Sequence, residues 1–127
     1  MTAALALATP VTFIITADAA RSRRFYAETL GLPLGAQDNF ATVYGLAGTI
    51  LRVTEVPGFV AGPHPVLGWK VADIAATVTA LTAAGVAFTI YDGFGQDAQG
   101  IWTSPDGVAK VAWFNDPDGN VLSLTQQ

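Results

Sequence analysis

Apolar runs and polar turns alternate along the first half of the chain in an order that predicts a strand, a helix and a hairpin. An apolar, β-branched run over 11–16 has the composition of a strand. Asp18 stands where a helix N-cap belongs, apolar residues follow at helical spacing over 19–30, and Gly31 ends the helix. Further alternation predicts a hairpin with strands over 40–46 and 49–56.

The second half of the chain repeats this order. Asp73 precedes a helical pattern over 74–84, and Gly85 follows it. The order is therefore βαβββ, linker, βαβββ, and an internal repeat of this size indicates two similar modules with a cleft between them. The predicted strands of the second module are 66–71, 86–91, 110–115 and 121–125, with a long loop over 92–107 in which Ile101-Trp102 is a candidate short strand.

At 127 residues the chain is expected to form a single domain, residues 1–127. The first module covers about 8–56 and the second about 66–127. The linker, 57–65, holds three prolines and two glycines. The apolar start, 1–10, has no basic residues and is expected to be a short leader or an extra strand rather than a secretion signal.

Composition narrows the function classes. Cysteine is absent, which excludes disulfides, thiolate nucleophiles and cysteine-based metal sites and is compatible with a cytoplasmic location. The net charge of −4 argues against nucleic acid as a partner, and no apolar run approaches the roughly 20 residues of a membrane span. Hydrophobic residues make up 51% and charged residues 13%, so apolar surface is expected to be hidden in a ligand cavity or a subunit interface.

Three groups of residues carry a resemblance to a known family. They are Asp18 with Phe25-Tyr26 and Leu30-Gly31-Leu32, then Asp73 with Ala84-Gly85-Val86, and finally Phe114-Asn115-Asp116-Pro117-Asp118-Gly119-Asn120. Together they resemble the vicinal oxygen chelate superfamily, which includes glyoxalase I, extradiol dioxygenases and bleomycin-resistance proteins. The resemblance covers about 11–126. It implies an α+β fold in which two tandem βαβββ modules form curved mixed sheets around a cavity, in a homodimer.

The resemblance also indicates where a metal would bind. Metalloenzymes of this superfamily place His, Glu or Gln at four inward-facing strand positions, which correspond here to Val11, Arg52, Val66 and Ser123. Two valines offer no lone pair, and a guanidinium repels a cation. We therefore expect no metal and no cofactor.

Strand alternation assigns side chains to the cavity. It places Phe13, Arg52 and Ser123 there, and a charge in apolar surroundings needs a partner. Arg52 is expected either to bind an anionic group of a ligand or to pair with Glu55 or a loop aspartate. Trp102 stands in the long polar loop, Trp113 faces the cavity if Phe114 faces the helix, and Tyr44 could offer a hydroxyl. His64, between two prolines, is either a solvated linker residue or a ligand contact, and the candidate ligand-binding residues are Arg52, Tyr44, Trp102, Trp113, Ser123, Phe13 and His64.

The favoured function is metal-independent binding of an apolar or aromatic small molecule, as in a bleomycin-resistance protein that sequesters an antibiotic or metabolite. One alternative is an enzyme of the glyoxalase or dioxygenase type, acting as a lyase, an isomerase or a ring-cleaving enzyme with a non-standard site. Another is a subunit or regulatory module without a ligand. A homodimer is expected, with no nucleic acid and no membrane as partner. The acidic chain suits a cationic ligand whereas Arg52 suits an anionic one, so the sequence leaves the charge of the ligand open.

Overall fold

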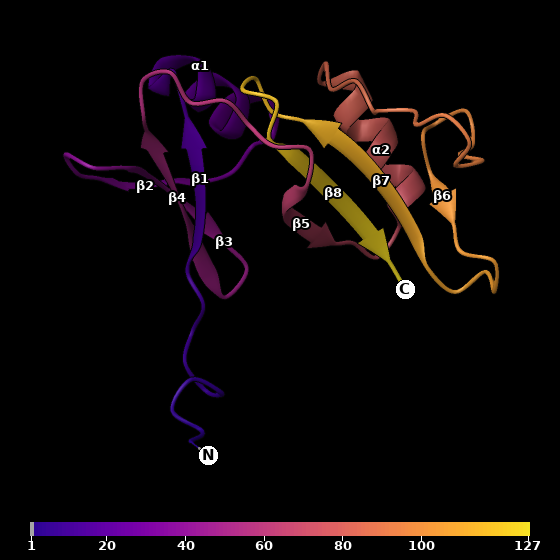
Figure 1. Cartoon of the computed structure of the whole chain (residues 1–127), viewed down its shortest axis with the longest axis horizontal. Coiled ribbons are helices and arrows are strands. Elements are labelled where there is room, and N and C mark those ends of the chain that lie inside the picture. Colours follow the sequence, from indigo (N-terminus) through magenta and orange to yellow (C-terminus); the bar gives the residue numbers. More distant parts are fainter. Residues whose placement is uncertain (1) are drawn as a thin grey trace.

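The computed structural model describes residues 2–127 and contains two modules of the same topology (Figure 1). In the N-terminal sheet the strand order is β1-β4-β3-β2, with β1 parallel to β4 and the other pairs antiparallel. The elements of this module are β1 (Thr12–Thr16), α1 (Ala19–Arg23), the π-helix η1 (Arg24–Thr29), β2 (Leu34–Gln37), β3 (Thr42–Leu46) and β4 (Thr49–Glu55).

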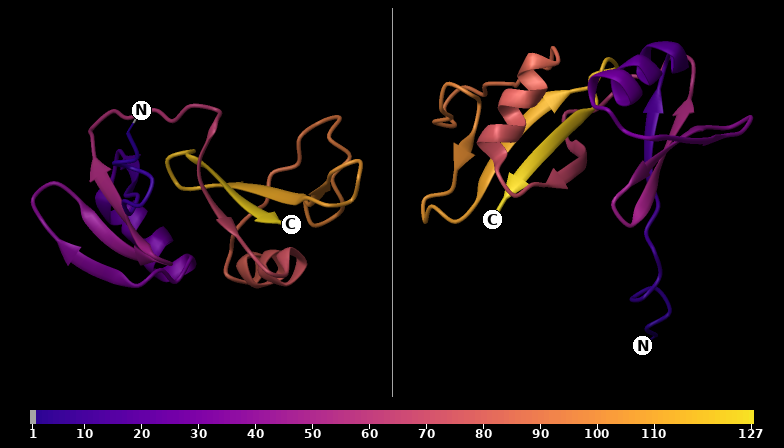
Figure 2. Two further views of the ribbon diagram at one scale, coloured as in Figure 1. Left: turned by 90° about the horizontal axis from the view of Figure 1, so that it is seen from below. Right: turned by 180° about the vertical axis from the view of Figure 1, so that it is seen from behind.

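The C-terminal sheet repeats this arrangement in the order β5-β8-β7-β6, again with one parallel pair, β5 and β8. Its elements are β5 (Pro65–Lys70), α2 (Ile74–Ala83), β6 (Trp102–Thr103), β7 (Lys110–Asn115) and β8 (Val121–Gln126). The two mixed sheets lie side by side (Figure 2). The predicted α+β fold of two tandem modules is confirmed.

Both helices begin as the sequence predicts. The carboxylate of Asp18 accepts a hydrogen bond of 3.1 Å from the backbone N–H of Arg21, and Asp73 does the same for Ala76. Each aspartate thus satisfies one of the amides that the first helical turn leaves unpaired. Gly85, with φ of +103°, ends α2 in a conformation that favours glycine.

The first helix differs from the single α-helix predicted over 19–30, because its second half is a π-helix. The N–H of Leu30 donates to the carbonyl of Phe25, five residues earlier, at 2.8 Å. Such wide turns are rare and locally rotate the side chains that follow. Here Tyr26 lies fully buried, and its hydroxyl donates to Asp116 at 2.7 Å. The π-helix thus comes together with a contact to Asp116, a turn residue far away in sequence. The helical spacing alone gives no sign of this contact.

The strand predicted over 86–91 is wrong. Only Phe88 makes a bridge there, to Phe114, and the N–H of Thr89 donates to the carbonyl of Trp113. The edge of the sheet belongs instead to the short strand β6, whose Trp102 pairs with Val111. The side chain of Phe88 packs against the core, and this segment therefore works as a packed loop rather than a sheet edge.

The turn between β7 and β8 joins the two modules at the end of the sheets nearest α1 (Figures 1 and 2). The buried carboxylate of Asp118 accepts hydrogen bonds from the hydroxyl of Thr16 at 2.5 Å and the N–H of Ala17 at 2.9 Å. It also pairs with Arg21 at 2.8 Å. A polar turn of one module thus holds the start of the first helix of the other.

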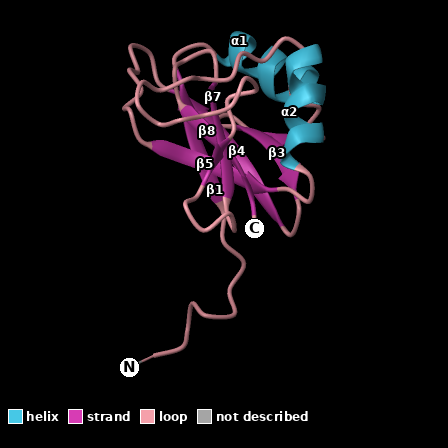
Figure 3. Cartoon of the chain, turned by 90° about the vertical axis from the view of Figure 1, so that its right-hand side faces the viewer, coloured by secondary structure: helices cyan, strands magenta, loops and turns pink. Residues whose placement is uncertain are grey.

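The segment before β1 extends away from the body of the molecule (Figure 3). Its described part, residues 2–10, forms turns, so the extra strand predicted there is wrong; Met1 lies outside the described residues. Leu5 and Leu7 are exposed. Among residues 2–127, no helix has the length and apolar character to cross a membrane.

Candidate functional site

Each sheet has one face against the helices and one face turned away from them, which we call the open face. Strand burial follows the predicted alternation: Ile14, Leu51 and Val53 are buried toward the helices, whereas their neighbours in sequence are more exposed. The same holds in the C-terminal sheet, where Leu122 and Leu124 are buried and Ser123 is half-buried. Alternation therefore placed the side chains on the correct face of each strand.

The open face of the N-terminal sheet is an exposed apolar surface. Phe13 is 63% exposed, and Ile15 and Ile50 are also exposed. Val11, just before β1, is exposed as well. Several large apolar side chains gathered on one sheet face are typical of a surface that a ligand or another chain covers.

Arg52 stands at the centre of this face, beside Phe13 on β1 and Val43 on β3. Its guanidinium pairs with the carboxylate of Asp38, which follows β2, at 3.0 Å. The pKa of Asp38 is lowered, first by the hydrogen bond from the N–H of Phe40 and then by Arg52. The structure therefore confirms the structural alternative for Arg52, a pair with a loop aspartate, and its charge is balanced within the chain.

The open face of the C-terminal sheet carries Trp113, Ser123 and Gly68 in one row across β7, β8 and β5. A Cβ atom at Gly68 would lie 2.5 Å from the hydroxyl oxygen of Ser123, so any larger residue there would force the side chain of Ser123 to move. The surface of this row therefore has little side-chain bulk beside Trp113. The neighbouring row holds Trp102 and Lys70 at its two ends. The predicted contacts Trp102, Trp113 and Ser123 are thus on one face.

An aromatic cluster borders this face. Tyr91 and Phe94 each meet Trp113 nearly edge-on, with ring centroids 5.6 and 5.9 Å away, and lie 5.3 Å from each other. The loop that carries them is tied down by Gln96, which accepts from the N–H of Tyr91 and donates to the carbonyl of Gly100. Sequence reasoning missed Phe94, although an aromatic residue between two glycines in a polar loop was an available signal.

Two predicted contacts lie away from the open faces. Tyr44 is fully buried on the helix side of the N-terminal sheet, 5.8 Å from the ring of Tyr26. Burial raises the pKa of Tyr44, and its hydroxyl has no hydrogen-bond partner among residues 2–127. The structure therefore removes Tyr44 from the candidate site, because its partner Leu51 fixes it on the packed face. His64 is exposed in the linker immediately before β5.

The four positions at which related metalloenzymes hold a metal do not fit one here. Val11, Arg52 and Val66 offer no donor to a cation, and Ser123 offers one neutral hydroxyl. The part of the chain that the structure describes has no cluster of three or more His, Cys, Asp or Glu side chains in metal-binding proximity. The open faces thus offer aromatic rings, aliphatic side chains and hydroxyl groups to a ligand. They also carry Lys70 and Arg52, and the charge of Arg52 is balanced by Asp38.

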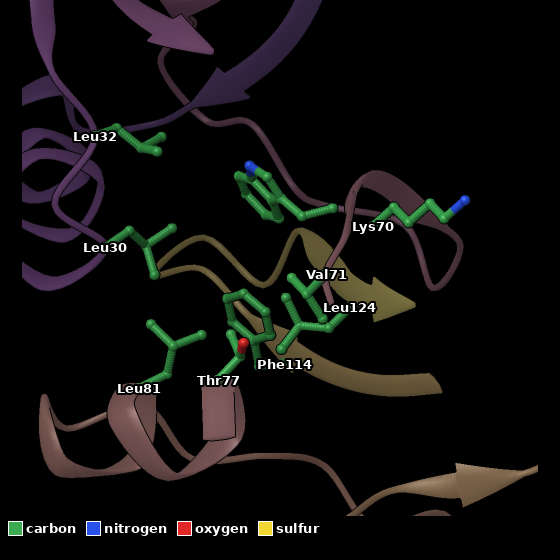
Figure 4. Close-up of a pocket in the computed structure, with 9 residues that line it drawn as sticks. Leu30, Leu32, Lys70, Val71, Thr77, Leu81, Phe114 and Leu124 are labelled. Atoms are coloured by element: carbon green, nitrogen blue, oxygen red, sulfur yellow. The ribbon is translucent and has the colours of Figure 1, made fainter. Parts of the chain in front are cut away.

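A separate apolar cleft of about 250 Å³ lies between the modules on the helix side (Figure 4). Leu30 comes from the N-terminal module, and Leu81 and Phe114 come from the C-terminal one. The hydroxyl of Thr77 in this cleft already donates to the carbonyl of Asp73, and the ammonium group of Lys70 points away from it (Figure 4). The cleft offers no free charge to orient a ligand, so we place the candidate site on the open faces.

Comparisons with known proteins agree with this architecture. The family model described as Glyoxalase/Bleomycin resistance protein/Dioxygenase superfamily matches residues 8–124. TnmS3, an antibiotic binding protein from Streptomyces sp. CB03234, is 26% identical with a TM-score of 0.65, over 91% of this chain and 92% of that one. Lactoylglutathione lyase from Agrobacterium tumefaciens is 14% identical with a TM-score of 0.71, over 94% and 93%. None of the curated proteins matches the chain significantly.

Proposed function

Because the chain belongs to the glyoxalase/bleomycin resistance protein/dioxygenase superfamily, we propose that it binds an apolar or aromatic small molecule without a metal, and so sequesters an antibiotic or metabolite. The observation that carries this proposal is the open face of the C-terminal sheet. There Trp113, Tyr91 and Phe94 form an aromatic wall beside the small residues Ser123 and Gly68. Flat apolar ligands gain most from such a wall. The similarity to an antibiotic binding protein supports the same function.

The metal-independent part of the proposal rests on donor chemistry. None of the four positions where the superfamily's metalloenzymes need His, Glu or Gln holds one of these residues in this chain. Ser123 supplies the single hydroxyl among them, and one hydroxyl cannot hold a divalent ion. No feature of the open faces among the described residues favours the lyase or dioxygenase alternative. Elemental analysis of the purified protein tests this part: stoichiometric zinc, nickel, iron or manganese would overturn it.

A second copy of the chain completes the site in this proposal. In one chain both open faces are uncovered, and Phe13, Ile15 and Val66 expose apolar surface on them. Packing the open face of one copy over that of another would bury this surface and enclose the ligand. The expected partners are therefore a small molecule and a second copy.

One pair of variants tests the assembly. Light scattering after gel filtration at micromolar concentration is expected to show a dimer for the wild type and a monomer for Phe13→Asp, because the new carboxylate would be buried unpaired. The matched control is Leu7→Asp, since Leu7 is 99% exposed in the segment that extends away from the body of the molecule (Figure 3). A monomeric wild type, or a dimer unaffected by Phe13→Asp, would contradict this arrangement.

Ligand binding is tested by calorimetric titration with a panel of uncharged and charged one- to three-ring aromatic compounds. The wild type is expected to bind several of them, and Trp113→Ala is expected to weaken all of them together, since the wall serves any flat ring. The absence of binding across the whole panel would overturn the proposed function.

A further inference from the structure

The charges around the open faces decide which aromatic ligand fits best. Arg52 is the cation that the sequence pattern singles out, but its guanidinium is already paired with Asp38 at 3.0 Å. Asp38 is in turn held by the backbone N–H groups of Phe40 and Ala41, each at 2.8 Å. Recruiting Arg52 to a ligand would therefore break an anchored pair.

Lys70 is placed differently. It lies on the open face of the C-terminal sheet, two residues after Gly68 and in register with Thr125 of β8. It is exposed, and no carboxylate within the described residues lies within 4.0 Å of its ammonium group. Lys70 is among the residues that line the apolar cleft, but its amine is directed away from that cleft (Figure 4). An unneutralised cation thus stands on the face that carries the aromatic wall.

The spacing between wall and cation suits a flat ligand with one charged end. Trp113 and Gly68 are two strands apart, which is roughly 10 Å, and Lys70 begins about 7 Å further along β5. The residues between them are small: Ser123 and Thr125 on β8 and Gly68 on β5. A fused-ring system lying over this row against Trp113 would bring a substituent on its far edge within reach of the flexible lysine side chain.

We infer that the ligand is a planar aromatic molecule with one anionic oxygen group, a carboxylate or a phenolate, and that Lys70 selects it by pairing with that group. This inference rests on the proposed function and adds the charge of the ligand to it. The acidic chain suits a cationic ligand, whereas Arg52 suits an anionic one. In this inference the local lysine, rather than the net charge of −4, determines which charge of the ligand is preferred. A charge-assisted contact at an exposed site is modest, so the preference is expected to be about five- to tenfold in affinity.

The test compares three probes of one shape: 2-naphthoate, the neutral 2-naphthamide and the cationic 2-naphthylmethylammonium. Calorimetry on the wild type in low salt is expected to rank naphthoate first, about five- to tenfold tighter than the amide. Lys70→Met should bring this ratio to about one, and Lys70→Arg should preserve it. The matched control is Lys110→Met, because Lys110 is on β7 but shares the parity of the buried Ala112 and Phe114 and therefore the opposite face. In 1 M NaCl, where the Debye length is about 3 Å, the wild-type ratio should also shrink.

The outcomes separate this inference from the proposed function. If naphthoate and naphthamide bind equally, or if Lys70→Met leaves their ratio unchanged, the inference is overturned while small-molecule binding stands. Tighter binding of the ammonium compound also overturns it. If no probe binds the wild type, the proposed function is overturned and the inference with it.

Discussion

The hydrogen bonds of Asp118 should hold the two modules together far more than its ion pair with Arg21 does. The side chain of Asp118 is 1% exposed, whereas that of Arg21 is 43% exposed. Replacing Asp118 by Ala leaves the N–H of Ala17 without its acceptor and removes the contact with the hydroxyl of Thr16. Each hydrogen bond to a charged group contributes about 1.5–3 kcal/mol, so the two together predict a loss of roughly 3–6 kcal/mol in the free energy of unfolding.

Arg21→Ala removes the third contact of the same carboxylate. Because 43% of the arginine side chain is exposed, its pair with Asp118 is partly screened by solvent and is expected to contribute about 1 kcal/mol or less. Asp118 keeps its bonds from Thr16 and Ala17 in this variant, so its charge is not left without donors. The expected order of stability is therefore wild type, then Arg21→Ala, then Asp118→Ala.

Urea unfolding followed by tryptophan fluorescence, at one protein concentration, measures this order. With a slope of about 1.5 kcal/mol per molar urea, the midpoint should fall by about 2–4 M for Asp118→Ala and by less than 1 M for Arg21→Ala. Asp92→Ala, at an exposed loop position, is the control and should leave the midpoint unchanged within error. Equal losses for the two test variants, or a larger loss for Arg21→Ala, would refute the reasoning from burial.

Two further predictions concern buried and exposed polar groups. Tyr26→Phe removes the hydrogen bond to Asp116 and should cost about 1.5–3 kcal/mol by the same urea assay; burial raises the pKa of Tyr26, so spectrophotometric titration should show no ionisation of this residue before the protein unfolds. A titration by NMR should show the pKa of Asp38 below its ordinary value in the wild type and still lowered in Arg52→Met, because the hydrogen bond from Phe40 is the larger cause. Since its folded pKa is lowered, Asp38 stabilises the protein above its unfolded pKa, and this contribution disappears as the pH falls through the folded value. A normal pKa for Asp38 in Arg52→Met would show that the arginine is the main cause.

Local signals in the sequence determined the modules, the helix starts and the faces of the strands. Asp18 and Asp73 cap helices because an aspartate before a helical pattern satisfies the first amides wherever the helix packs. Alternation placed Phe13 and Ser123 on open faces because successive side chains in a strand point to opposite sides. These rules act over a few residues, so they need no knowledge of the rest of the chain.

Contacts between residues far apart in sequence decided the rest. The same alternation could have placed Tyr44 on either side of the hairpin; its register with Leu51 buries it. Arg52 had several possible partners, and the path of the loop after β2 selected Asp38. The wall of Tyr91, Phe94 and Trp113 forms where a loop, held in shape by hydrogen bonds of Gln96 to the loop's own backbone, packs against a strand that begins 14 residues after Gln96. Such pairings depend on where the backbone returns in space, which only the tertiary structure determines, and they decide which charge on the open faces is left for a ligand.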